Sequence, residues 1–102
     1  MPAKFALVFT SIATSHLRAF TKFEQRLIVE AIEQQLLYEP TQETRNKKPL
    51  RDNLISDWEL RVGKYRIFYD VILEETPKVV KVKGIGHKEH NILYLGGKEV
   101  QL

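Results

Sequence analysis

The sequence predicts an α+β fold in which an N-terminal strand and a helical hairpin pack on a small antiparallel sheet. Three patterns predict it. Residues 4–10 form an apolar stretch typical of a strand, residues 21–38 carry a helical pattern, and residues 55–85 alternate between apolar and polar side chains. Helices that precede a run of strands, rather than alternating with them, favour the α+β class.

The composition allows one hydrophobic core, so residues 1–102 are interpreted as a single domain. With 43% hydrophobic and 10% aromatic residues, the chain can bury enough apolar surface to stay ordered. The absence of cysteine excludes a disulfide framework, a thiolate metal site and a cysteine nucleophile. The apolar stretches are too short for a signal peptide or a membrane span, which predicts a cytoplasmic protein.

The first two elements are expected before residue 21. Apolar side chains fill successive positions of residues 4–10, so this strand is expected to be covered on both faces. Residues 15–20 are expected to form a short helix, with Thr14 or Ser15 as its N-cap.

The second helix has the strongest local signal. Thr21 and Glu24 have the spacing of a capping box, in which the two side chains satisfy exposed backbone donors reciprocally. Apolar residues then recur at three-to-four spacing until Pro40, which cannot continue a helix. These apolar positions are Phe23, Leu27, Ile28, Ala31, Ile32 and Leu36.

Residues 41–49 are polar and are expected to form an irregular connection. Its basic residues are expected to be solvated: Arg45, Lys47, Lys48 and Arg51. Three strands are then expected at residues 55–62, 64–73 and 79–85, with Gly63 in a tight hairpin. They predict an antiparallel meander.

Alternation along these strands assigns their faces. One face is expected to pack against the helices, and its residues are Trp58, Leu60, Val62, Tyr65, Ile67, Tyr69, Val71, Val80 and Val82. The other face is expected to be strongly basic, and its charged residues are Arg61, Arg66, Lys81 and Lys83, with Glu59 among them. Together with the net charge of +3, this face suits an anionic partner.

The C-terminal residues are expected to add two minor elements. Residues 89–93 are expected to form a helical turn, which Gly96 and Gly97 end. Residues 99–102 are expected to return as a small edge strand.

Three groups of residues carry a resemblance to a known family. They are ELRVGKYRIFYD at residues 59–70, GIGHK at residues 84–88, and Tyr94. Their order and spacing resemble the RelE/ParE toxins of type II toxin–antitoxin systems, and the resemblance covers nearly the whole chain. It implies a ribosome-dependent mRNA endonuclease, in which a ribose 2′-hydroxyl attacks the adjacent phosphate without a metal or other cofactor. It also implies three partners: a cognate antitoxin, the ribosome and mRNA.

The resemblance also implies roles for individual residues. Arg66 matches the family's phosphate-contacting arginine on the central strand, Lys88 lies where mRNA-cleaving members have an arginine, and Tyr94 matches a tyrosine near the C-terminus. The candidate RNA-binding residues are Arg61, Lys81, Lys83 and Lys88. In a purely structural interpretation, Arg66 is solvated or pairs with Asp70 or Glu59.

The acid–base pair departs from the best-studied members of that family. Asp57 and Glu59 stand where those members carry two lysines. Other RNA-cleaving members use a glutamate and a histidine, so Glu59 is the provisional base and His87 the provisional acid, on adjoining strand ends. With Arg66 and Tyr94, these two residues complete the set of candidate catalytic residues.

The remaining histidines, His16 and His90, are interpreted as structural or solvated. His87 and His90 are three residues apart, but no third ligand of suitable type lies near them in the sequence, so no metal site is predicted.

Two other functions stay open. Within the same fold, ParE-like members inhibit DNA gyrase, and the missing lysine pair keeps that function possible. From another class, a non-catalytic module could bind RNA or an acidic protein segment through the basic face alone.

Overall fold

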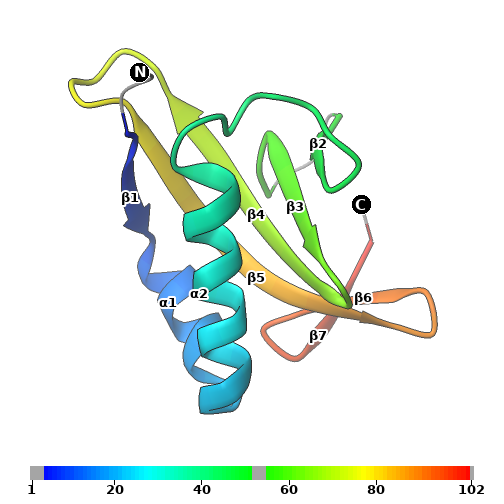
Figure 1. The fold of residues 1–102 in the computed structure, drawn as a ribbon. Coiled ribbons are helices and arrows are strands. Elements are labelled where there is room, and N and C mark those ends of the chain that lie inside the picture. The colour runs from blue at the N-terminus through cyan, green and yellow to red at the C-terminus, as the bar shows by residue number, and fades with distance from the viewer. Residues whose placement is uncertain (1–3, 52–54, 102) are drawn as a thin grey trace.

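The computed structural model describes residues 4–51 and 55–101 (Figure 1). The elements follow in the order β1 (Ala6–Phe9), α1 (Ser11–Arg18), α2 (Lys22–Leu36), β2 (Lys47–Pro49), β3 (Trp58–Val62), β4 (Tyr65–Ile72), β5 (Val79–Glu89), β6 (Ile92–Leu95) and β7 (Lys98–Val100). The strands form one sheet in the order β2-β3-β4-β5-β6-β7, and β1 pairs with β5. The predicted α+β class, with a helical hairpin on a mainly antiparallel sheet, is confirmed.

The first strand lies at an edge of the sheet. β1 runs parallel to the beginning of β5, from Ala6 opposite Val79 to Phe9 opposite Val82. Its odd-numbered residues pack against the core, whereas Val8 is 45% exposed. The expectation that this strand is covered on both faces is therefore wrong, because one face of β1 remains open to solvent.

The two helices begin where side chains cap them. The hydroxyl of Thr10 accepts a hydrogen bond from Ala13 N, so α1 begins at Ser11, earlier than the predicted residue 15. The capping box predicted for α2 is present in both directions between Thr21 and Glu24.

Both helices lie against one face of the sheet (Figure 1), and the hydrophobic core cluster lies between them. Fully buried Ile28, Ile32 and Leu36 of α2 contribute to the same cluster as the alternate residues predicted on β3, β4 and β5. The predicted helix-covered face is confirmed. Neither helix, in the part of the chain that the structure describes, is long and apolar enough to cross a membrane.

Lys47 is not solvated, contrary to expectation. It is 5% exposed, and its Nζ donates hydrogen bonds to Gln35 O at 3.1 Å and Glu39 O at 2.9 Å. A helix leaves its last carbonyl groups without partners, and this ammonium group satisfies one at the end of α2 and one just beyond it. The connection after α2 is therefore ordered, and it forms β2.

Replacing Lys47 with methionine is expected to lower the free energy of unfolding by about 1–3 kcal/mol, because two backbone carbonyl groups lose their charged donor. Methionine fills a similar volume, so lost packing contributes little. Urea denaturation of the variant and of Lys48→Met, at the partly exposed neighbouring position, measures the difference. Equal stability of the two variants would contradict the capping role.

The C-terminal region is a β meander and not a helical turn. β5 continues to Glu89, and His90 (φ 52°) and Asn91 (φ 67°) form a two-residue connection to β6. Positive φ at both positions is typical of a type I′ turn, which matches the twist of a hairpin. Gly96 and Gly97 form the second turn, before β7. The predicted edge strand corresponds to β7, and its last residue, Leu102, lies outside the described residues.

Candidate functional site

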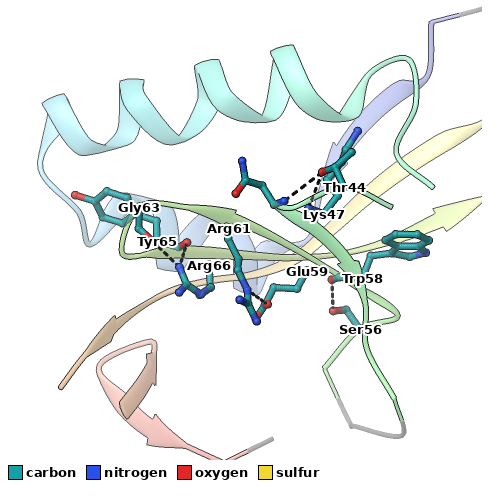
Figure 2. A network of polar contacts seen from close by, with 10 residues as sticks. Thr44, Lys47, Ser56, Trp58, Glu59, Arg61, Gly63, Tyr65 and Arg66 are labelled. Carbon is teal, nitrogen blue, oxygen red and sulfur yellow. Dashed lines mark hydrogen bonds and ion pairs between the residues drawn. The ribbon is translucent and has the colours of Figure 1, made fainter. Parts of the chain in front are cut away.

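The face of the sheet away from the helices carries a group of cations. Arg61 on β3 and Arg66 on β4 lie directly opposite each other, and Gly86 on β5 lies opposite Arg66. Lys88 follows on the same face of β5, two residues after Gly86. Figure 2 shows the side chains of Arg61 and Arg66, with Glu59, on the side of the sheet turned away from α2. We call this face, with these four charged residues, the open face.

Glu59 is a buried carboxylate within the open face. Its side chain is 4% exposed, and its Oε1 accepts a hydrogen bond from Arg61 Nε at 2.9 Å. Burying a charge is costly unless the charge is paired, and Arg61 is the partner here. The pair holds one guanidinium group beside Arg66.

Arg66 is partly anchored to the backbone. Its Nη1 donates to Gly63 O at 2.7 Å and to Tyr65 O at 2.9 Å, whereas its Nε is buried without a hydrogen-bond partner in the described structure. Burial lowers the pKa of Arg66, the neighbouring Glu59 raises it, and Arg61 lowers it. An arginine remains charged despite such a shift, so the open face carries a fixed positive charge at this position.

A hollow of about 460 Å³ lies beside these cations. β3 contributes Glu59 and Arg61, β5 contributes Lys88, and β6 and β7 contribute Leu93 and Val100 among others. Ligand sites in proteins have volumes of about 300–1,000 Å³, so a nucleotide-sized group fits this hollow. The sequence pattern did not reveal it, because it depends on how β6 and β7 return toward β3.

The predicted basic surface is divided into two groups. Lys83 Nζ lies 3.2 Å from Asp70 Oδ2, and Lys81 lies opposite Asp70 in the register of β4 and β5. Asp70 also accepts a hydrogen bond from Asp57 N. Lys83 is therefore partly neutralised. Lys81 and Lys83 lie toward the part of β5 that pairs with β1, away from Arg61 and Arg66.

His87 and Tyr94 come together on the opposite face from Glu59. Their rings stack at 5.3 Å between centroids, and Phe20 contacts His87 edge-on at 6.2 Å. Because His87 lies opposite Tyr65, a core residue, it shares the helix-covered side of the sheet. The structure therefore does not bring His87 and Glu59 together as the expected pair on adjoining strand ends.

A second hollow, of about 320 Å³, surrounds this aromatic pair. Its charged and titratable lining residues are His16, Glu24, Lys64, His87 and Tyr94. His87 Nε2 also lies 3.8 Å from Glu89 Oε2, an ion pair when the histidine is protonated. No group of three or more residues that could hold a metal ion is found within residues 4–51 and 55–101.

His16 completes the hydrogen bonding of β5. β1 pairs with the first part of β5 and β6 with its last part, and between them Ile85 N donates to His16 Nδ1 at 3.2 Å. This hydrogen bond gives His16 a structural role, as predicted. Burial lowers the pKa of His16 below the usual 6.5, so the neutral ring that can accept this bond is favoured.

Folding stability is expected to decrease as the pH falls below 6.5, since the unfolded chain protonates His16 before the folded protein does. The stabilisation that neutral His16 provides is fully present above pH 6.5 and is lost as the pH falls through the lower pKa of His16 in the folded protein. Urea denaturation at pH 7 and pH 5 measures it. The His16→Gln variant should show a smaller pH difference, whereas His90→Gln should keep the wild-type difference; the reverse pattern would contradict this role.

Comparison with known proteins gives a family and a structural relative. Residues 7–92 match the family model described as the ParE toxin of the type II toxin–antitoxin system parDE. A solved structure titled as the toxin–antitoxin complex RelBE2 from Mycobacterium tuberculosis matches with a TM-score of 0.71 and 28% sequence identity, over 84% of this chain and 93% of that chain. No curated protein sequence matches the chain.

Proposed function

Since the chain belongs to the ParE toxin family of type II toxin–antitoxin systems, we propose that it is a toxin that inhibits translation by cleaving mRNA on the ribosome. The proposed reaction is attack by a ribose 2′-oxygen on the adjacent phosphate, with departure of the 5′-oxygen of the next nucleotide. It requires cations around the phosphorane, a proton acceptor for the 2′-hydroxyl and a proton donor for the leaving oxygen.

The observation that carries this proposal is the convergence of Arg61, Arg66 and Lys88 on the open face. Three cations on neighbouring strands suit a phosphate whose negative charge grows during the reaction. Arg66 Nη1 bonds the backbone and Nε is buried, so Nη2 is the guanidinium nitrogen proposed to contact that phosphate. Glu59 lies on the same face and is the proposed proton acceptor.

The proposed roles of His87 and Tyr94 require the RNA to contact both faces of the sheet. Because the stacked pair lies on the helix-covered side of the sheet, RNA bound at Arg66 must continue around the end of β5 to reach it. When the RNA follows this path, a base stacks on Tyr94 and His87 donates the proton to the leaving oxygen. Lys81 and Lys83 are proposed to contact more distant phosphates.

The proposed partners follow from the same premise. The matched RelBE2 structure is a toxin–antitoxin complex, which supports a cognate antitoxin for this toxin. The mRNA and ribosome are the proposed target, and they place the activity in the cytoplasm.

A second candidate function is inhibition of DNA gyrase. The family model that matches the chain is that of ParE toxins, and the separation of Glu59 from His87 removes one expected acid–base pair. A gyrase inhibitor needs only a binding surface, which the basic open face supplies.

Primer extension on mRNA bound to programmed ribosomes tests the proposal against this alternative. The purified wild-type protein is expected to cut within the codon in the ribosomal A site, while supercoiling by gyrase in a parallel reaction continues unchanged. Intact mRNA together with blocked supercoiling would replace the proposed function by gyrase inhibition. Naked mRNA is expected to be cut poorly, because the ribosome positions the reacting atoms.

A further inference from the structure

The hollow beside the open face is lined by both apolar and charged side chains, although it is not part of the hydrophobic core. Leu93 and Val100 face each other across β6 and β7 and line it, and Leu50 contributes a third apolar side chain. Arg61 and Lys88 line the same hollow with charge. An apolar surface next to cations is the arrangement that unpaired nucleotides require, since the base packs on the former and the phosphate binds the latter.

The elements that close the hollow extend beyond the family match. The match to the family model ends at residue 92, whereas β6 continues to Leu95 and β7 spans Lys98–Val100. The two-residue turns at His90–Asn91 and Gly96–Gly97 make this return possible. The apolar lining from Leu93 and Val100 is therefore supplied by a segment outside the matched region.

We propose that this hollow is a nucleotide-binding subsite, in which the base next to the phosphate held by Arg61, Arg66 and Lys88 packs on Leu93 and Val100. This inference rests on the proposed function for its RNA ligand. The volume of about 460 Å³ accommodates one nucleotide. Packing on aliphatic side chains involves the face of a base and not its edges, so the subsite adds affinity with little preference among bases.

Filling the hollow tests the subsite. Val100→Trp places an indole ring among the lining residues, and Val100→Ala leaves the space open. Glu33→Trp is the control, because Glu33 is exposed on α2 and does not line the hollow, so an equal change of residue is made far from it. Circular dichroism and thermal unfolding establish that each full-length variant is folded.

The measurement is binding of fluorescein-labelled hexanucleotides at low salt. Oligo(A) and oligo(U) with 2′-O-methyl riboses serve as probes because they cannot be cleaved by 2′-oxygen attack. Val100→Trp is expected to weaken both by tenfold or more. Val100→Ala keeps the space but loses apolar contact with the base, so it should weaken both by a smaller factor of about threefold, whereas Glu33→Trp should bind as wild type does. Wild-type affinity in Val100→Trp, or no binding of either probe by the wild-type protein, would overturn the proposal.

Cleavage on programmed ribosomes separates this inference from the proposed function. If the wild-type protein binds the probes but leaves ribosome-bound mRNA intact, the proposed function fails while the binding comparison still decides the subsite. If Val100→Trp cuts mRNA at the same sites and at the same rate as wild type, the subsite is excluded while the ribonuclease stands.

Discussion

Arg66→Ala is expected to reduce cleavage of ribosome-bound mRNA by about 100-fold or more, the usual consequence of removing one donor from a site that stabilises developing charge. The guanidinium lies opposite Arg61, and its buried Nε has no protein partner among the described residues. Arg66→Lys should recover little, because an ammonium group cannot bond two backbone carbonyl groups and a phosphate in the same planar arrangement. Single-turnover cleavage rates on programmed ribosomes measure the loss.

Two controls make this result specific. His87→Ala changes the helix-covered side of the sheet, and Lys83→Ala removes a cation that already pairs with Asp70. Lys83→Ala should change the cleavage rate little. The size of the change in His87→Ala shows whether RNA reaches the helix-covered side of the sheet. Because Arg66 also ties down the β3–β4 turn, thermal unfolding must show that the alanine variant is folded. Unchanged cleavage by a folded Arg66→Ala protein would exclude the open face as the catalytic site.

Gly86→Ala is expected to lower the free energy of unfolding by about 3 kcal/mol, at the upper end of the usual cost of overpacking. A Cβ atom at this position would lie 2.2 Å from Tyr94 O and 3.1 Å from Leu95 Cδ1. The first contact is with backbone, so β6 would have to move away from β5. Urea denaturation measures the change.

Gly84→Ala is the matched control two residues earlier on the same strand. Its added Cβ would meet Leu95 Cδ1 at 3.4 Å, an ordinary contact with a flexible side chain, so a loss below about 1 kcal/mol is expected. Equal stability of the two variants would mean that β5 and β6 do not approach as closely as described. Loss of RNA binding in Gly86→Ala would further indicate that the position of β6 supports the hollow.

Local signals in the sequence were sufficient for the elements that position the open face. The capping box at Thr21 marks the start of α2, and the period of two along β3 to β5 separates core residues from Arg61 and Arg66. These patterns are reliable because each side chain acts on its own backbone or on its own face of a strand.

Features that depend on distant contacts were not predictable from those signals. Nothing near Lys47 in the sequence indicates that its ammonium group binds Gln35 O and Glu39 O. Glu59 and His87 were expected to be neighbours, whereas alternation and strand order place their side chains on opposite faces of the sheet. The pattern His90–Asn91 also contains a turn signal, since asparagine tolerates positive φ, and it could have indicated the β5–β6 hairpin.

The parallel pairing of β1 with β5 has a consequence for the moment at which this toxin becomes harmful. Residues 6–9 pair with residues 79–82, so the first strand has no sheet partner until residues 79–82 have been synthesised. Contacts between such distant segments form late in folding. Lys88, on the same late strand, joins the cations of β3 and β4 only then. The group of cations on the open face is therefore incomplete in any nascent chain that ends before β5, and such a chain lacks the proposed phosphate-binding site.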